Sequence, residues 1–248
     1  MINIFMKSPL TNSLAVVVLI ALVITWFTSI ILSLRDAPVK TDKGWYAMLL
    51  PLFTLLGIPA TIDLLQTKGI TVLYAAVVFI IFLLNIIVPI LRITGKSSHP
   101  LVMDWYRWAI LLSTIAGLAV AGYLTFVEST GTQIVCGPSN GCGDVQNSKY
   151  AILFGILPVG ILGLAGYLGI LAAWIAWQFG PNSIKKMAIL AIWGMCIFGV
   201  LFSAYLTFLE PFVIGATCMW CISSAVLMIN TLLASTPFAQ QALVIADE

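Results

Sequence analysis

Seven long apolar runs constrain this chain more than any other feature of its sequence. A helix that crosses a bilayer needs about 20 predominantly apolar residues, because the hydrocarbon core is about 30 Å thick. Backbone polar groups find no water there, so only helices and closed barrels span membranes. Six of the runs meet this length, a seventh comes close, and their continuous character favours helices over barrel strands. The runs are 12–34, 45–65, 70–90, 105–127, 151–179, 187–209 and 216–234.

The composition agrees with a membrane protein and excludes a soluble domain. Hydrophobic residues make up 61% of the 248 residues, and charged residues make up 8%. The predicted fold class is all-α: a polytopic membrane protein with seven transmembrane helices. We expect run 151–179 to bend at Pro158, because proline removes a backbone donor. We expect run 12–34 to remain as a helix, since it is longer than a signal-peptide core and no small-residue cleavage pattern follows it.

The distribution of Lys and Arg predicts an orientation, because cytoplasmic loops carry the excess of basic residues. With the N-terminus outside, more basic residues fall on the inner connections than on the outer side. We therefore expect the N-terminus outside, the C-terminus in the cytoplasm and the paired cysteines on the extracytoplasmic face. The inner residues are Arg35, Lys40, Lys43, Arg92, Lys96, Arg107, Lys185 and Lys186, and the outer ones are Lys7, Lys68 and Lys149.

An internal repeat links the second half of the chain to its cysteines. Residues 123–128 read YLTFVE, and residues 205–210 read YLTFLE. Each copy ends a predicted helix, and a cysteine lies eight residues after its final glutamate, Cys136 in one copy and Cys218 in the other. The repeat predicts a core of runs four to seven, arranged as a four-helix bundle, with the first three helices outside it. We expect the two glutamates to be solvated and inert; a role in proton handling is the alternative.

The cysteines form two pairs and one single residue. Cys218 and Cys221 are three residues apart at the predicted start of the seventh helix, so both fall on one face. The positive dipole end and unpaired N–H groups of a helix start favour a thiolate. Cys136 and Cys142 flank a glycine-rich loop that can move. Cys196 lies in mid-helix and is expected to be an apolar filler.

Three interpretations of the two pairs remain open from spacing alone. They are structural disulfides, which are normal outside the cytoplasm, a zinc site of four thiolates, and a relay that moves electrons by thiol–disulfide exchange. A Cys-x-x-Cys disulfide closes almost no loop, so its entropic stabilisation is small. Four free thiolates are poorly placed in an oxidising compartment. The relay is therefore the favoured interpretation.

A relay needs an electron acceptor. The sequence has no Cys-x-x-Cys-His haem motif and no nucleotide-binding glycine pattern between a strand and a helix. By elimination, we expect a quinone dissolved in the bilayer, stacked on Tyr150, Phe154 or Trp220. These aromatic residues could equally anchor the protein at the membrane interface, which is their commoner role.

Two segments carry a family resemblance. Residues 142–155 (CGDVQNSKYAILFG) and 203–228 (SAYLTFLEPFVIGATCMWCISSAVLM) resemble the vitamin K epoxide reductase family, including its bacterial members. The resemblance covers about residues 105–235. It includes, in order, a loop Cys-x5-Cys, a serine six residues after the second cysteine, and a Cys-x-x-Cys at a helix start.

The resemblance implies a role for each residue of the site. Cys218 and Cys221 would form the active pair beside the quinone, with Cys221 nearer to the ring and forming the adduct with it. Cys142 would attack the disulfide of this pair at Cys218. Cys136 would then resolve the mixed disulfide and exchange with an external partner. Ser148 matches a serine near the reaction centre of the family; it could also cap the fifth helix.

Three departures from the family refine this expectation. Ala225 stands where vertebrate members carry a tyrosine, which favours a plain quinone of the menaquinone or ubiquinone type over vitamin K epoxide. Segment 154–158 is one residue longer than the Phe-Gly-Ile-Pro of bacterial members. Many bacterial relatives carry a fused thioredoxin-like domain, whereas only a short tail is expected after the seventh helix. The expected partner is therefore a separate extracytoplasmic thioredoxin-like protein.

The sequence thus predicts three regions and one main function. Residues 1–100 would form an N-terminal three-helix membrane region of unknown role, 101–236 the catalytic four-helix core, and 237–248 a cytoplasmic tail. The main hypothesis is a multi-pass enzyme of the bacterial inner membrane that passes electrons from its partner to a quinone and so promotes disulfide formation. The alternative is a non-catalytic subunit of a larger membrane complex, held through helices one to three, with structural disulfides.

Overall fold

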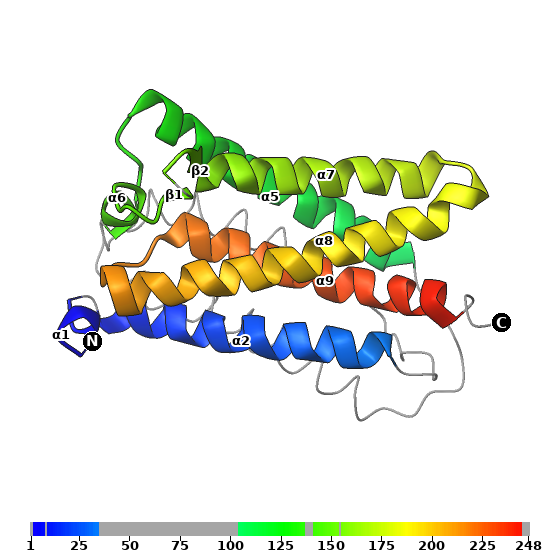
Figure 1. Ribbon diagram of the computed structural model, residues 1–248, viewed down its shortest axis with the longest axis horizontal. Helices are drawn as coiled ribbons and strands as arrows, with labels where there is room; N and C mark the ends of the chain where they lie inside the picture. The colour runs from blue at the N-terminus through cyan, green and yellow to red at the C-terminus, as the bar shows by residue number, and fades with distance from the viewer. Residues whose placement is uncertain (1, 8, 35–103, 137–140, 154, 245–248) are drawn as a thin grey trace.

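The protein folds as a bundle of long helices (Figure 1). The computed structural model describes residues 2–7, 9–34, 104–136, 141–153 and 155–244. The predicted runs 45–65 and 70–90 lie outside these described residues. The helices are α1 (Ile2–Phe5), α2 (Pro9–Ser33), α5 (Asp104–Thr130), α6 (Gly141–Gln146), α7 (Val159–Phe179), α8 (Asn182–Leu209), the π-helix η1 (Glu210–Ile214) and α9 (Met219–Val244).

Five of the described helices are long and apolar enough to cross a membrane. They correspond to the first, fourth, fifth, sixth and seventh predicted runs, so the helical membrane fold is confirmed for these five. In Figure 1 they run side by side along the long axis of the molecule. Their candidate spans are Ala15–Ser33, Tyr106–Thr130, Val159–Phe179, Asn182–Ile214 and Met219–Val244.

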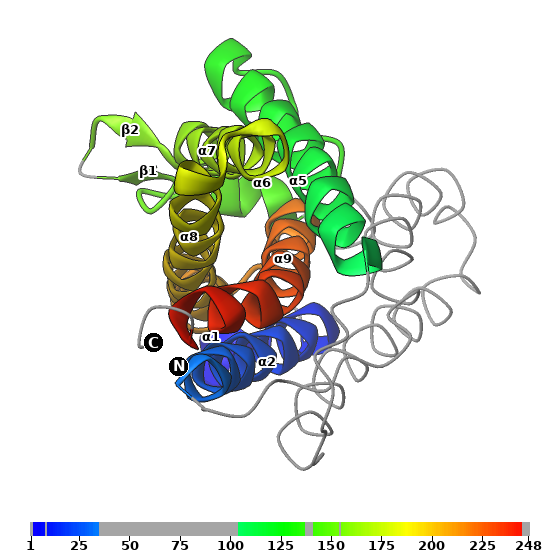
Figure 2. The same cartoon turned by 90° about the vertical axis from the view of Figure 1, so that its right-hand side faces the viewer.

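Helix α9 lies at the centre of the bundle. It packs against α2, α5 and α8, and Figure 2 shows it enclosed by these helices. In an apolar 18-residue window of its candidate span, 89% of the residues are buried, against 22% in the corresponding window of α7. The four helices that the repeat marks are in mutual contact, because α5 packs on α7 and α9, and α8 packs on α7 and α9. The Cys-x-x-Cys motif therefore begins the most enclosed of the candidate spans.

The first predicted helix belongs to this bundle and does not stand apart from it. Helix α2 packs along both α8 and α9. The hydroxyl groups of Ser29 and Thr236 are 2.7 Å apart, and the indole N–H of Trp193 donates to Ser29 Oγ over 2.9 Å. Hydrogen bonds of this kind hold helices together in lipid, where apolar burial gives no driving force between them. They fix α2 in register against the central helix.

The expected bend in run 151–179 is wrong, because its first residues are not helical. They form two short antiparallel strands, β1 (Ile152–Leu153) and β2 (Leu157–Pro158). Gly155, in the turn between them, has a φ of 72°, which favours glycine. Pro158 occupies the N-cap position of α7, where its missing N–H removes no helical hydrogen bond. The hairpin and α6 lie at the same end of the bundle as α1 (Figure 1).

The last helix is longer than the sequence indicated. Helix α9 continues beyond the expected end near Ala234, passes through Pro237 and ends at Val244. Phe238 and Gln240 are buried, so this segment packs within the bundle. The apolar run ends at Ala234 because polar residues follow it, yet Ser235 and Thr236 are buried within the protein.

One tyrosine joins three of the core helices. Tyr167 on α7 is fully buried, and its hydroxyl donates to the carbonyl oxygen of Ser224 on α9 over 3.0 Å. Its ring lies directly on Gly117 of α5, where a Cβ atom would overlap the ring. The absence of a side chain at Gly117 therefore allows the close approach of α5 and α7.

Candidate active site

Both cysteine pairs lie at the same end of the bundle, as the repeat predicts. Cys136 and Cys142 form a disulfide, with Cα atoms 5.8 Å apart. Cys142 is buried in α6, whereas Cys136 is partly exposed. Cys218 directly precedes α9, and Cys221 lies in its first turn; neither is in a disulfide. The structure thus has an oxidised loop pair and a reduced helix pair.

The two pairs adjoin through the residues that precede them. A Cβ atom on Gly141 would lie 2.8 Å from the carbonyl oxygen of Thr217 and 3.1 Å from its nitrogen. No real Cβ tolerates such an approach to backbone, so only glycine fits here without a shift of α6. Gly141 precedes Cys142, and Thr217 precedes Cys218. The contact therefore brings α6, which carries Cys142, against the segment that leads to Cys218.

The environment of Cys218 favours its thiolate. Cys218 is fully buried. The thiol of Cys221 donates a hydrogen bond to its sulfur, and the backbone N–H groups of Trp220 and Cys221 add to this. These donors lower the pKa of the Cys218 thiol below its ordinary value, although burial acts in the opposite direction. A helix start supplies unpaired N–H groups for this purpose.

Glu210 lies beside the same pair, and the expectation that it is solvated is wrong. Its side chain is only 2% exposed. One carboxylate oxygen accepts the N–H of Cys218 over 3.2 Å, and the thiol of Cys221 is within hydrogen-bonding reach of the same carboxyl group. The π-helical turn η1 directs this side chain inward. The sequence analysis gives proton handling only as the alternative, although the repeat pairs this glutamate with a downstream cysteine.

Glu128, the equivalent residue of the first repeat, binds a different helix start. Its carboxylate accepts the N–H of Gly160, in the first turn of α7, over 3.1 Å and 3.3 Å. The residue is partly buried. Both repeats therefore place a glutamate on the N-terminal turn of a neighbouring helix, where the helix dipole favours a negative charge.

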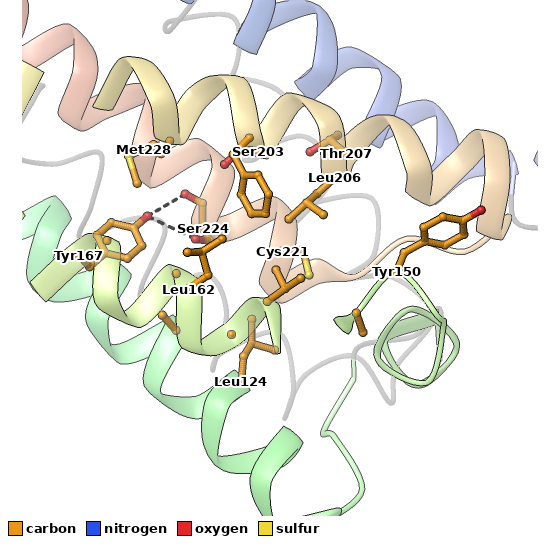
Figure 3. A pocket seen from close by; sticks show the side chains of 18 of the residues that line it. Leu124, Tyr150, Leu162, Tyr167, Ser203, Leu206, Thr207, Cys221, Ser224 and Met228 are labelled. Carbon is orange, nitrogen blue, oxygen red and sulfur yellow. Dashed lines mark hydrogen bonds between the residues drawn. The ribbon is translucent and has the colours of Figure 1, made fainter. Parts of the chain in front are cut away.

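A cavity of about 420 Å³ opens between α5, α7, α8 and α9, with Cys221 in its wall (Figure 3). Apolar side chains form most of the lining, among them Leu124, Leu162, Leu206 and Met228. Glu128, Glu210 and Ser224 are among its few polar residues. An apolar cleft with a small number of placed polar groups is typical of sites for small organic ligands.

The predicted site residues other than the cysteines divide into three groups. Ser148 and Tyr150 line the cavity together with Cys221. The Ser148 hydroxyl donates to the carbonyl oxygen of Val145 over 2.7 Å, so it does not cap α7 as the alternative expected. Trp220 does not line the cavity. Phe154 lies outside the described residues.

Trp220 instead supports the segment that leads to the loop pair. Its indole N–H donates to the carbonyl oxygen of Val135 over 2.8 Å, and its ring centroid lies 4.5 Å from that of Tyr123. The Tyr123 hydroxyl in turn accepts the N–H of Val135 over 2.9 Å. Two aromatic side chains thus hold the backbone next to Cys136.

Helix α2 supports the other pair through Asn12. The Asn12 amide oxygen accepts the hydroxyl of Thr217 over 2.9 Å, and its amide nitrogen donates to the carbonyl oxygen of Phe5 over 2.8 Å. Asn12 and Thr217 are fully buried. The first helix therefore fixes the residue that immediately precedes Cys218.

Replacement of Asn12 by alanine is expected to destabilise the fold by about 1–3 kcal/mol, because it leaves the buried Thr217 hydroxyl without its acceptor. Thermal unfolding in detergent measures the effect. Thr132→Ala is the control, because this exposed residue loses only a surface hydrogen bond to Thr130. Equal unfolding temperatures for the two variants would contradict the supporting role of α2.

Comparison with known proteins finds a family match and a similar protein. The model of the vitamin K epoxide reductase family matches residues 108–236. The thiol-disulfide oxidoreductase LTO1 of Arabidopsis thaliana is 33% identical over 112 residues, which are 42% of this chain and 29% of that protein. The chain thus matches less than a third of the length of this relative. No solved structure matches.

The family match includes every part of the site described above except the support from α2. Residues 108–236 contain both cysteine pairs, both repeat glutamates and the helices that enclose the cavity. They make up just over half of the sequence. The chain belongs to the vitamin K epoxide reductase family.

Proposed function

We propose that the protein is a quinone-linked thiol–disulfide oxidoreductase of the membrane. The observation that carries this proposal is the position of Cys221 in the wall of an apolar cavity between the helices, while Thr217, which precedes Cys218, contacts Gly141, which precedes Cys142. One pair is thus accessible from the lipid-embedded part of the bundle, and the other is accessible from its end. A quinone supplies an acceptor for two electrons and two protons.

The proposed roles follow the order of contacts. A dithiol partner reduces the Cys136–Cys142 disulfide. The Cys142 thiolate attacks Cys218 in the oxidised helix pair, so that a Cys142–Cys218 disulfide forms and Cys221 leaves as a thiolate. Cys136 then attacks Cys142, which restores the loop disulfide and releases Cys218. Each exchange breaks one S–S bond and forms another.

Ser148 and Tyr150 would bind and orient the ring. These two residues line the cavity together with Val145 and Gln146 of α6, the helix that carries Cys142. We include Phe154 as a further candidate from its sequence position. Residues 101–236 would form the catalytic core, and α2 of the region 1–100 supports it through Asn12.

The orientation is part of the proposal. Arg107 lies in the first turn of α5, and Lys185 and Lys186 lie near the start of α8, whereas Lys7 follows α1 and Lys149 follows α6. Helices α5 and α8 begin at the end of the bundle opposite α1 and α6 (Figure 1). Basic residues are enriched on the cytoplasmic side. We infer that the cysteine end faces outward, in a bacterial inner membrane.

The proposed electron donor is a separate thioredoxin-like protein. The partly exposed Cys136 lines a second cavity of about 470 Å³, which also includes Thr132, Gln133 and Asn147. Its polar rim suits the backbone of a protein partner, and it leaves the sulfur of Cys136 approachable. Exchange at this cysteine would oxidise the partner and so promote disulfide formation outside the cytoplasm.

The test is the reduction of an added menaquinone or ubiquinone analogue by a dithiol donor, with purified protein in detergent. We expect turnover by the wild type and none above background by Cys221→Ser. Cys196→Ala is the control, because Cys196 is buried in α8 and is not among the residues that line the cavity. Absence of turnover by folded wild type with either quinone would favour a non-catalytic subunit with structural disulfides.

A further inference from the structure

Glu210 makes contacts that a structural role alone does not require. A buried carboxylate is costly unless it is paired or hydrogen-bonded. Among the described residues, the Glu210 carboxylate has one backbone partner, the N–H of Cys218. The carboxyl group is also within hydrogen-bonding reach of the Cys221 thiol and lines the cavity. Its position therefore joins the helix pair to the cavity where the acceptor is proposed to bind.

The backbone of η1 is built to direct this side chain. The carbonyl oxygen of Glu210 accepts the N–H groups of Gly215 over 2.7 Å and of Ala216 over 3.2 Å. The first of these is the wide hydrogen bond of a π-turn, and such turns are frequent at functional sites. Glu128, the equivalent residue of the first repeat, lies in the regular helix α5 and binds α7 instead. The two repeats therefore differ in the backbone at this glutamate, and only in the second repeat does the glutamate lie beside a thiol pair.

The reduced pair carries a proton that must leave. The hydrogen bonds at the helix start favour the thiolate at Cys218, so the remaining proton is on Cys221. The sulfur of Cys221 is nucleophilic only after that proton is removed, because the thiolate is the reactive form. Cys221 faces the apolar cavity, where water is a poor proton acceptor. A carboxylate within hydrogen-bonding reach can take this role.

We propose that Glu210 is the proton acceptor for Cys221. In this step the S–H bond of Cys221 breaks, an O–H bond forms on the Glu210 carboxyl group, and both electrons of the S–H bond stay on sulfur. The step is redox-neutral. The inference deepens the proposed function, because it names the group that activates the thiol next to the acceptor site.

The test measures alkylation of Cys221 by iodoacetamide against pH, in reduced protein without quinone, with modified residues located by mass spectrometry. In the wild type, proton transfer to Glu210 keeps a fraction of Cys221 in the reactive thiolate form. The rate of its alkylation is therefore independent of pH over part of the pH range. In Glu210→Gln this component is lost, and the rate falls by about tenfold for each unit of decrease in pH, as for an isolated thiol. At pH 5 to 6, we expect the variant to react at least tenfold more slowly.

The comparison controls for effects on structure. Glutamine keeps an oxygen for the N–H of Cys218, so the start of α9 retains its partner. Glu128→Gln is the matched control and is expected to keep the pH-independent component. The titratable groups that face the Cys221 thiol or line its cavity are Cys218 at the start of α9, Glu210 of η1, Glu128 of α5, Tyr150 before β1 and Tyr167 of α7.

Two outcomes would overturn the inference. One is a Glu210→Gln profile that matches the wild type. The other is a wild-type rate that rises uniformly with pH throughout, which needs no variant to observe. Either result leaves quinone reduction by the wild type intact if the proposed function is correct, because alkylation is measured without an acceptor. Failure of turnover with a normal alkylation profile would instead count against the proposed function.

Discussion

Replacement of Cys136 by serine is expected to trap a disulfide between Cys142 and Cys218 in most molecules. Without Cys136, the Cys142 thiolate attacks the oxidised helix pair at Cys218, and no thiol remains in the loop to resolve the product. The residues that precede these two cysteines, Gly141 and Thr217, are in close contact. We expect turnover with a dithiol donor to fall to background, since the loop pair no longer cycles.

Peptide mass spectrometry under non-reducing conditions measures the trapped species. Free thiols are first alkylated with N-ethylmaleimide, so Cys221 should carry the label while Cys142 and Cys218 are linked. The double variant Cys136→Ser with Cys218→Ser is the control and should lack the link. An intact Cys218–Cys221 disulfide beside an alkylated Cys142 would contradict direct exchange between the pairs, and a Cys142–Cys221 link would contradict the assigned order.

The membrane helices and the common location of the cysteines were predictable because both depend on local signals. Apolar runs of sufficient length allow few structures in lipid. The repeat fixes the spacing between each helix end and its cysteine, so Cys136 and Cys218 arrive at the same end of the bundle. The family resemblance rests on these same segments, which is why it agrees with the match over residues 108–236.

The packing of α2 was not predictable, because an apolar helix gives no sign of which face meets protein. A soluble helix reveals its buried face by amphipathic periodicity, whereas both faces of a membrane helix are apolar. The contacts that hold α2 come from single polar residues such as Asn12 and Ser29. Their partners are distant in sequence, so only the structure shows that they meet.

The predictions for segment 151–158 and for Glu210 are wrong because neighbouring residues in the sequence suggest a different local structure. The apolar residues before Pro158 extend a helical run in composition, and nothing in their hydropathy separates a short hairpin from a helix turn. Glu210 follows a helix end, a place where glutamates are usually solvated. The π-turn that begins at Glu210 directs its side chain into the protein and not toward solvent, and such turns have no reliable sequence signature.

Gly141→Ala is expected to slow electron transfer from the loop pair to the helix pair by up to about 10²-fold, the cost of a displacement near 1 Å at reacting atoms. The added Cβ would lie 2.8 Å from the carbonyl oxygen of Thr217, so α6 must move away from the segment before Cys218. Cys142 follows Gly141 directly and must move with it. The rate is measured as quinone reduction after rapid mixing with protein whose loop pair has been reduced.

Gly143→Ala is the matched control, since this glycine lies on the same short helix and a Cβ there would meet no atom of the described residues within 4 Å. A small dithiol that reduces Cys218–Cys221 directly provides a second readout, and Gly141→Ala should leave this bypass rate unchanged. Slowing of both routes would indicate damage to the helix pair or the cavity. Equal rates for the two alanine variants would show that the close approach of α6 to Thr217 has no part in the exchange, because only one of them alters that contact.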